Sequence, residues 1–396
     1  MLRRARGALS IILIGMPPSE VTAIATAAAT TTAPDAVTRL AAALQLRGGP
    51  WRNAVLEPLR DKGLAHDHIR LAGTGALARL PKQSQLGLPA LDNLAYQATC
   101  FERAAASGHT PRLLGVLPPG DDLPRGGLLV EEIIGRPARL PHDLPAIMGA
   151  LAAIHALALP DAALRPPLIN APDPLAALLQ DIQAQAQHLN AARLEAPVRS
   201  AIDTGIAQLQ ELCSVQLRPA RQLIAFDAHP GNFLIRPDGK AVLVDLEKCR
   251  YSYPGLDLAH ATLYTSTTWD VDTSADLAVG DVIGAYAVWD ARAGMVTRPS
   301  ASRRKSAEVN VMSGESRWHL PLRRAMWLWS LTWCAKWRAV SGLQAGDSPD
   351  GEDWSAGRSD ALLIAHVRNR VDHYLSPQGV AHVMCEFDAL ETTWRR

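Results

Sequence analysis

Residues 223–249 constrain the fold more than any other segment of the chain. They read LIAFDAHPGNFLIRPDGKAVLVDLEKC, in which two short apolar runs each end in an aspartate, Asp227 and Asp245. The runs NFLI and AVLVDLE are separated by Arg-Pro-Asp-Gly, and this sequence suits a turn because proline presets φ and glycine tolerates positive φ. The segment therefore predicts a β-hairpin flanked by two carboxylates and the carboxamide of Asn232.

These three side chains are predicted to meet in one cleft. Asp227 and Asn232 are five residues apart across His-Pro-Gly, so both can lie on one tight loop, and Asp245 returns on the far strand of the hairpin. A carboxylate and a carboxamide oxygen suit Mg2+, which uses few protein ligands when it binds phosphates. The other carboxylate can then accept a proton from a hydroxyl. Together these groups can transfer a phosphoryl group to an alcohol.

The composition is that of a globular protein with one two-lobed domain or two domains. The chain has 396 residues, of which 48% are hydrophobic and 20% charged. Its formal net charge of +1 gives no global field that would favour nucleic acid or an anionic membrane. The five cysteines are far apart and lack metal-ligand spacing, which is typical of thiols in a reducing cytosol. We therefore expect a cytoplasmic protein with no nucleic-acid or membrane partner.

Residues 1–50 are predicted to be a flexible tail. The chain starts with MLRRARGALSIILIGM, which has the basic start and apolar run of a weak signal peptide. No small-residue cleavage site follows promptly, and the run is too short to span a bilayer. We interpret it as a mobile tail or as an over-extended start upstream of Met16. The ATAAATTTAPDA segment that follows is of low complexity.

Residues 51–135 are rich in predicted strands. LEPL, HIRL and GALARL are separated by glycines, as in a twisted meander, and RLLGVL and GLLVEEI follow a helix predicted over 91–108. The remainder of the chain is mainly helical, with helices predicted over 145–157 and 195–213. The polar segments interpreted as solvated loops are 292–317 and 345–359.

Three motifs resemble those of aminoglycoside phosphotransferases, whose superfamily also includes choline, homoserine and thiamine kinases. FDAHPGN, VLVDLE and PGLDLAHA correspond in order to the family's HGDLHPGN, VIDWE and DPAYDLA. Ahead of them, KGLAHDHIRL resembles the glycine-rich nucleotide loop, LARLP the next strand and LLVEEIIGRP the hinge. The resemblance covers about residues 51–390, and the order of the segments matches as well as the motifs.

The resemblance implies an α+β, two-lobed protein-kinase-like fold. Residues 51–135 would form a small antiparallel-sheet N-lobe that binds nucleotide. Residues 136–396 would form a larger, mainly helical C-lobe with the catalytic loop and the substrate site. The implied activity is Mg2+-dependent transfer of the γ-phosphoryl group of ATP to a hydroxyl of a small, aminoglycoside-, choline- or thiamine-like molecule.

The resemblance also assigns roles around the hairpin. Asp227 would be the catalytic base, and His229 would orient its loop or approach phosphate, unless its role is purely structural. Asp245 would be the principal magnesium ligand and Asn232 a second one. Asp257, at the start of the next helix, would brace the catalytic loop.

The phosphate contact expected on the strand GALARL is Arg79, with Lys82 as the alternative. Arg79 shares a strand face with Leu77, so it can enter the cleft only if Leu77 faces the cleft as well. The helix position that usually carries glutamate aligns with Gln97, which is expected to hydrogen-bond Arg79. The other nucleotide-binding positions implied by the resemblance are Gly63, Val130, Glu131, Glu132 and Ile133.

Two positions depart from the family pattern. Ala225 replaces the first histidine of the motif, which removes a loop-bracing hydrogen bond, and Gln97 holds a neighbour less strongly than an ion pair does. These changes favour a second hypothesis, a non-catalytic kinase-like module that binds nucleotide or a partner. Against it, the chain keeps Asp227, Asn232 and Asp245, and a binding module needs no base.

The acceptor is less constrained than the reaction. Four large apolar side chains share one face of a predicted helix, and they either pack in the core or form an aromatic wall for a cationic substrate. They are Met326, Trp329, Trp333 and Trp337. The other candidate substrate contacts are Trp269, Asp270 and Glu247, of which Glu247 is alternatively a group behind the metal ligands.

Four further polar residues receive structural interpretations. His66, Asp67 and His68 lie in the segment that resembles the nucleotide loop, and we interpret them as polar residues of the loop tip and not as metal ligands. His155 ends an apolar helix and is interpreted as a hydrogen-bonded core histidine.

Overall fold

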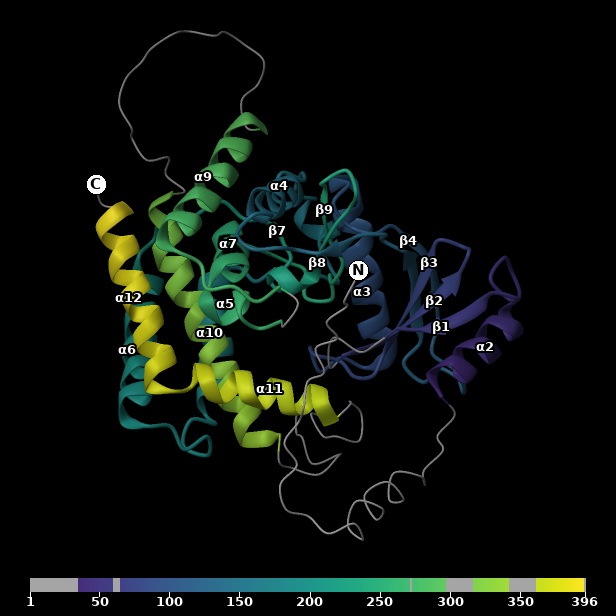
Figure 1. The fold of residues 1–396 in the computed structure, drawn as a ribbon, viewed down its shortest axis with the longest axis horizontal. Helices are drawn as coiled ribbons and strands as arrows, with labels where there is room; N and C mark the ends of the chain where they lie inside the picture. Colours follow the sequence, from purple (N-terminus) through teal and green to yellow (C-terminus); the bar gives the residue numbers. More distant parts are fainter. Residues whose placement is uncertain (1–34, 60–64, 271–272, 297–315, 342–360, 395–396) are drawn as a thin grey trace, which may run out of the picture.

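The computed structural model describes residues 35–59, 65–270, 273–296, 316–341 and 361–394. These residues form a small lobe built on a sheet and a larger helical lobe (Figure 1). Gly63, the segment 345–359 and most of the segment 292–317 lie outside the described residues.

The smaller lobe contains a five-stranded antiparallel sheet. Its strands lie side by side in the order β1-β2-β3-β5-β4. All five strands predicted between residues 51 and 135 are present, because each short apolar run is bounded by turn residues. The strands are β1 Val55–Pro58, β2 His66–Ala72, β3 Ala76–Pro81, β4 Leu113–Leu117 and β5 Gly127–Glu131.

Helix α2 (Ala36–Arg47) covers one face of this sheet. The side chain of Asp35 caps its first turn, and Leu40 and Leu44 are buried in an apolar cluster with residues of β2 and β3. Burying a leucine contributes about 1.5–3 kcal/mol. The prediction of a flexible tail over 1–50 is therefore wrong for this helix, since its apolar face docks on the sheet.

Helix α3 (Ala90–Ala104) lies on the opposite face, between the sheet and the larger lobe (Figure 1). Leu94, Ala98 and Phe101, which were predicted to share one face of this helix, are buried in a cluster with residues of β5 and of the larger lobe. A 3-10 turn continues the helix to the left-handed Gly108 (φ +65°). The helix predicted over 91–108 is thus confirmed.

The larger lobe is mainly helical, as predicted. Helix α10 is central to it and packs against α5, α6, α7, α11 and α12. Its helices are α4 Leu144–His155, α5 Pro174–Ala186, α6 Ala196–Ser214, α7 Pro254–Thr262, α8 Tyr264–Thr267, α9 Val279–Val296, α10 His319–Val340, α11 Ala361–Tyr374 and α12 Pro377–Trp394. Helices α4 and α6 correspond to the helices predicted over 145–157 and 195–213.

Two small ribbons carry the central segment. The predicted hairpin is formed by β8 and β9, which pair directly, and β6 joins them. The strand before Asp227, β7, pairs instead with β10, so the two aspartates follow strands of different sheets. The strands are β6 Arg136–Pro137, β7 Gln222–Ile224, β8 Phe233–Ile235, β9 Ala241–Leu243 and β10 Arg250–Ser252.

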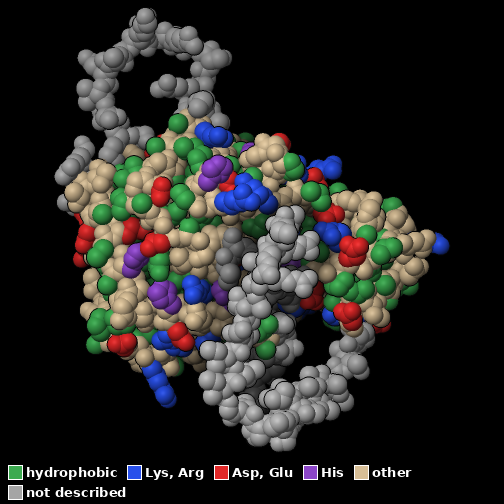
Figure 2. All heavy atoms as spheres, in the orientation of Figure 1, with side chains coloured by type: hydrophobic (Ala, Val, Ile, Leu, Met, Phe, Trp, Pro, Cys, Tyr) green, Lys and Arg blue, Asp and Glu red, His purple; other side chains and the backbone are tan. Residues whose placement is uncertain are grey.

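The surface is of mixed character, and the thiols form no disulfides. Basic and acidic side chains are interspersed among apolar ones on the face shown in Figure 2. Within the described ranges, no helix combines the length and the apolar character needed to cross a membrane. All five cysteines are unbridged, and Cys100, Cys249 and Cys334 are buried, where a thiol packs as a small apolar group.

Candidate active site

The hairpin brings Asp227, Asn232 and Asp245 together. Asp227 lies in the loop after β7, Asn232 ends the 3-10 turn before β8, and Asp245 follows β9. The Asn232 side-chain nitrogen donates to the carbonyl oxygen of Asp227 at 2.9 Å. The backbone N–H of Val244 donates to the Asn232 carbonyl oxygen, also at 2.9 Å. These bonds join the loop of Asp227 to the loop of Asp245.

The carboxylate of Asp227 contacts a lysine that sequence reasoning missed. Nζ of Lys248 lies 2.7 Å from Asp227 Oδ2, and Nδ1 of His260 lies 3.7 Å from Oδ1. Burial alone would raise the pKa of Asp227, but the charge of Lys248 and the rings of His229 and His260 outweigh it. The pKa of Asp227 is therefore below its usual value, and the group is ionised at neutral pH.

Arg79 reaches the cleft and pairs with Asp245. Its Nη2 lies 2.6 Å from Asp245 Oδ1, and its Nη1 donates to the Val244 carbonyl oxygen at 2.9 Å. Although burial would raise the pKa of Asp245, the Arg79 guanidinium holds this pKa well below its usual range. Leu77 packs on the same side of the sheet as Arg79, in the cluster that contains α3. Strand alternation thus predicted the direction of Arg79 correctly.

Gln97 does not hold Arg79, and that prediction is wrong. Its side chain is 2% exposed and contacts His66 (Nε2 to Oε1, 3.1 Å) and Glu247 (Nε2 to Oε2, 3.4 Å). The interpretation of His66 as a loop-tip residue is also wrong, because it lies in β2 and is 3% exposed. Asp67 and His68 likewise belong to β2 and not to the loop before it.

His66, Gln97 and Glu247 form a buried triad of neutral groups. Burial and the charge of Arg79 lower the pKa of His66 to about 3. Burial and the charge of Asp245 raise the pKa of Glu247 to about 8. His66 Nδ1 lies 3.5 Å from Glu247 Oε2, so the two pKa shifts go with a close contact in which neither charge is favoured.

Asp257 braces the loop that carries Asp227. Its fully buried carboxylate accepts hydrogen bonds from the backbone N–H groups of Ala225 (2.7 Å) and Phe226 (2.8 Å). His155 donates to it at 3.0 Å and in turn accepts from Trp289 at 3.0 Å, which confirms His155 as a hydrogen-bonded core histidine. Phe226 has a left-handed φ of +61°, a conformation that costs a non-glycine residue about 1–3 kcal/mol. The carboxylate offsets this strain at the residue directly before Asp227.

Asp257→Asn is expected to lower the free energy of unfolding by about 3 kcal/mol, because an amide accepts these hydrogen bonds more weakly than a buried carboxylate does. Chemical denaturation measures the change. Asp203→Asn on the exposed side of α6 is the matched control. A loss no larger than that of the control would contradict the bracing role.

Asp270 lies next to the loop of Asp227, and Trp269 lies in an aromatic cluster beside it in the chain. A Cβ atom placed on Gly231 would lie 2.8 Å from Asp270 Oδ2 and 3.0 Å from His229 Cε1, so the Asp270 carboxylate lies against this loop. The Trp269 ring stacks on Tyr374 with centroids 6.2 Å apart. Of the two predicted substrate contacts, Asp270 therefore borders the loop of Asp227, and Trp269 precedes it in the chain.

The tryptophan stripe on α10 has two parts. Met326 and Trp337 are 0% and 2% exposed and pack in the core, as the first interpretation predicted. Trp329 and Trp333 are only partly buried. Trp329 contacts the ring of Phe226 (centroids 5.1 Å apart), and Trp333 contacts Trp269 (5.9 Å). This second pair extends toward the catalytic loop.

The predicted hinge residues are held by burial and by ion pairs with other parts of the chain. Val130 and Ile133 are buried. Glu131 Oε1 lies 3.0 Å from Arg236 Nη2. Glu132 Oε1 lies 2.5 Å from Nε of Arg70 in β2. The two glutamate side chains are thus used in ion pairs within the protein, so any contact of these residues with a nucleotide base would be made by the backbone.

Asp245 and Asn232 suit Mg2+ because their side chains carry oxygen atoms, the ligands that this ion prefers. Asn232 uses its side-chain nitrogen to donate to Asp227, and its Oδ1 is the atom of the type that Mg2+ prefers. Asp245 keeps Oδ2 while Oδ1 pairs with Arg79. Across the part of the chain that is described, no cluster of three or more His, Cys, Asp or Glu side chains forms a metal site. Magnesium needs no such cluster, because it retains several waters and binds phosphates.

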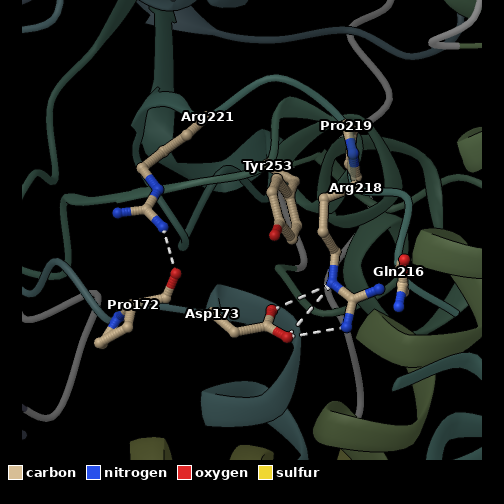
Figure 3. Close-up of a pocket in the computed structure, with 7 residues that line it drawn as sticks. All are labelled: Pro172, Asp173, Gln216, Arg218, Pro219, Arg221 and Tyr253. Carbon is tan, nitrogen blue, oxygen red and sulfur yellow. Dashed lines mark hydrogen bonds and ion pairs between the residues drawn. The ribbon is translucent and has the colours of Figure 1, made fainter. Parts of the chain in front are cut away.

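Two pockets lie apart from these residues. One, of about 300 Å³, is shown in Figure 3 and is lined by Pro172, Asp173, Gln216, Arg218, Pro219, Arg221 and Tyr253. Asp173 and Arg218 form a bidentate pair with a closest contact of 2.7 Å, and Arg221 donates to the Pro172 carbonyl oxygen at 2.7 Å. These side chains therefore already have hydrogen-bond partners, and their contacts connect the start of α5 to the segment after α6. The second pocket, of about 410 Å³, lies between α6, α10 and α12.

Solved structures of small-molecule kinases share this fold. Plasmodium vivax ethanolamine kinase matches with a TM-score of 0.56 at 12% identity, covering 95% of this chain and 99% of that one. A choline/ethanolamine kinase family protein from Mesorhizobium loti gives 0.51 at 15% identity, with 89% and 98% covered. An aminoglycoside phosphotransferase in a ternary complex with ADP and hygromycin B gives 0.51 at 12% identity, with 85% and 98% covered. These likenesses confirm the expected two-lobed, protein-kinase-like fold.

A family comparison covers the site itself. No curated protein sequence matches the chain. The model of the APH family, described as the phosphotransferase enzyme family, matches residues 71–295, more than half of the 396 residues. The matched range contains Arg79, Asp227, Asp245 and Asp257. The chain therefore belongs to the APH phosphotransferase enzyme family.

Proposed function

We propose that the chain is a small-molecule kinase that transfers the γ-phosphoryl group of ATP, with Mg2+, to a hydroxyl of a small acceptor. The observation that carries the proposal is the meeting of Asp227, Asn232 and Asp245 in one site. Asn232 bonds the Asp227 carbonyl oxygen at 2.9 Å, and its own carbonyl oxygen accepts from the residue before Asp245. A base beside a hard-oxygen metal position is what phosphoryl transfer to an alcohol requires.

Asp227 is the general base in this proposal. Its lowered pKa keeps it ionised, and the loop that positions it is fixed by Asp257. Asp245 and Asn232 would hold Mg2+, which would supply positive charge to offset that of the phosphates. His229, whose buried Nδ1 has no hydrogen-bond partner among the described residues, orients the loop or approaches phosphate.

The Arg79–Asp245 ion pair must rearrange when nucleotide binds. The Arg79 guanidinium neutralises Asp245, with Nη2 at 2.6 Å from Oδ1. A triphosphate competes for this guanidinium with charge-assisted hydrogen bonds, which releases Asp245 Oδ1. The same ion pair is the one observation that favours a non-catalytic module as the second candidate, because it occupies part of the metal position.

Amine-bearing alcohols are the acceptor class that we propose. The Asp270 carboxylate at the catalytic loop supplies negative charge, and the partly exposed rings of Trp269 and Trp333 supply faces that attract cations. The aminoglycoside hygromycin B in one structurally similar protein supports this class. Glu247 is excluded as a direct contact, because it is buried beneath the site with Gln97 and His66.

A nucleotide-consumption screen tests the proposal. Amino-alcohols, sugars and vitamin alcohols are incubated with ATP, Mg2+ and the full chain, and ADP formation is measured with the Asp227→Asn variant as the control. We expect at least one acceptor to raise ADP formation in the wild type only. Tight ATP binding with no consumption for any acceptor would favour the non-catalytic module instead.

Arg79→Ala is expected to weaken ATP binding by about 10–100-fold and adenosine binding by much less, because it removes hydrogen bonds to charged phosphate. Calorimetric dissociation constants for both ligands measure the difference. Lys82→Ala is the comparison, since Lys82 Nζ lies 3.7 Å from Asp67. A larger loss for the triphosphate in Lys82→Ala would make Lys82 the anchor.

A cytoplasmic location forms part of the proposal. Its support is the five unbridged cysteines, which are typical of a reducing compartment, and the proposed use of ATP.

A further inference from the structure

Lys248 connects the metal loop to the base loop. It follows Asp245 by three residues and reaches Asp227 with Nζ at 2.7 Å from Oδ2, and both side chains are 16% exposed. Burial lowers the pKa of Lys248, but the charge of Asp227 outweighs this effect and raises the pKa. Lys248 is therefore a fixed positive charge in the proposed catalytic centre.

Because Lys248 contacts the proposed base, Asp227, the position of the base also determines how far the ammonium lies from the reacting groups. Lys248 donates to Oδ2 of Asp227, whereas Nδ1 of His260 lies 3.7 Å from Oδ1, beyond hydrogen-bond distance. A general base must approach the hydroxyl that it deprotonates to about 2.6–3.2 Å, and that hydroxyl oxygen must lie about 3–3.5 Å from the phosphorus. The ammonium of Lys248, on its flexible four-carbon stem, is then within reach of the oxygens of the transferring phosphoryl group.

Neighbouring cations do not have this position. The guanidinium of Arg250 lies 3.6 Å from the centroid of the Phe226 ring, so its charge is used in a contact with the residue before Asp227. Arg79 comes from the smaller lobe and pairs with Asp245. Asp227 pairs instead with Lys248, whose Nζ lies 2.7 Å from its Oδ2.

We propose that Lys248 is a catalytic residue whose ammonium contacts the phosphoryl group during transfer; the inference rests on the proposed kinase function. In the step, the acceptor hydroxyl gives its proton to Asp227, and its oxygen forms a bond to the γ-phosphorus. The bond between the γ-phosphorus and the bridging oxygen breaks, and its electron pair leaves with ADP. Lys248 keeps its protons and donates hydrogen bonds to the non-bridging oxygens, on which the negative charge is spread.

The first test needs no acceptor. Planar aluminium fluoride with ADP and Mg2+ mimics the transferring phosphoryl group, and calorimetry compares its binding with that of ADP and Mg2+ alone. We expect Lys248→Met to reduce the affinity gained from aluminium fluoride by at least about tenfold, with ADP affinity changed less than about threefold. Lys248→Arg should keep most of the gain, because it preserves the charge. Lys240→Met, in the hairpin turn, is the matched control and should resemble the wild type.

The second test separates contact with phosphate from mere positioning of the base. With an acceptor found in the screen, Lys248→Met is introduced into Asp227→Asn, and kcat is measured for the single and double variants. A further loss of at least about tenfold in the double variant supports direct contact. Equal rates for Asp227→Asn and the double variant would overturn it, because Lys248 would then act only through Asp227.

The outcomes distinguish this inference from the proposed function. Aluminium fluoride affinity that is unchanged in a folded Lys248→Met variant, checked by its thermal unfolding, overturns the role of Lys248 and leaves the kinase function intact. A wild-type chain that gains no affinity from aluminium fluoride and consumes no ATP with any acceptor overturns both. If Lys248→Met does not fold, Lys248→Gln and Lys248→Arg are compared by the same measurements, and equal gains for these two variants overturn the inference.

Discussion

Asp245→Asn is expected to abolish Mg2+-dependent phosphoryl transfer while the chain remains folded. A neutral amide cannot balance a dication, and the only other side-chain ligand proposed here, Asn232, is itself an amide. The substitution also removes the counter-ion of Arg79 at 2.6 Å, so the guanidinium stays unpaired until phosphate binds. The rate of ADP formation over a range of Mg2+ concentrations measures the effect, and thermal unfolding confirms that the fold survives.

Two comparisons isolate the metal in this experiment. Arg79→Ala breaks the same ion pair but keeps the carboxylate, so it should retain Mg2+-dependent turnover at saturating ATP. Asp203→Asn repeats the chemical change on the exposed side of α6 and should have no effect. Near-normal turnover of Asp245→Asn at any Mg2+ concentration would remove Asp245 from the metal site.

Local patterns explain why the hairpin and the direction of Arg79 could be predicted. The turn residues Arg236 to Gly239 and the apolar runs on either side determine β8 and β9 without help from distant parts of the chain. In β3, the alternation of side chains places Leu77 and Arg79 on one face because the period of a strand is two residues. These two predictions depended only on neighbours in the sequence, and both agree with the structure.

The partner of Gln97 could not be predicted in the same way. Its hydrogen bonds go to His66 and to Glu247, which is 150 residues away in the sequence. The family pattern suggested a pair with Arg79, but a neutral amide gains little from a guanidinium that already has a carboxylate at 2.6 Å. The position of Gln97 was inferred by analogy with a glutamate, and the change of charge also changed the partner.

Two features were missed although the sequence contains a signal for them. Helix α2 has an N-cap aspartate, Asp35, and leucines four residues apart at Leu40 and Leu44, which is the pattern of a short amphipathic helix. The low complexity of the preceding segment hid this pattern. Lys248 is a charged residue in a segment that is otherwise mostly apolar or acidic, and such a residue needs a partner when it is buried. Only the folded chain shows that the partner is Asp227.

Asp227→Asn is expected to reduce kcat by at least about 10²-fold, the typical loss when a general base is removed. The amide has no oxygen basic enough to take the proton of the acceptor hydroxyl. Nucleotide binding should change little, because Asp245 and Asn232 keep their oxygens for the metal and Arg79 keeps its reach to phosphate. Single-turnover rates and calorimetric ATP affinity, measured on the same preparation, separate these two effects.

The geometry around Asp227 makes this prediction sharper. The substitution leaves Lys248 without the carboxylate that it contacts at 2.7 Å, so its ammonium is free to bind an anion, and ATP affinity should stay the same or rise. Asp238→Asn, in the exposed turn of the same hairpin, is the matched control and should retain full activity. If Asp227→Asn instead lost ATP affinity and spared turnover, Asp227 would be the metal ligand and Asp245 the base. Loss of a metal ligand weakens nucleotide binding, whereas loss of a base slows the chemical step.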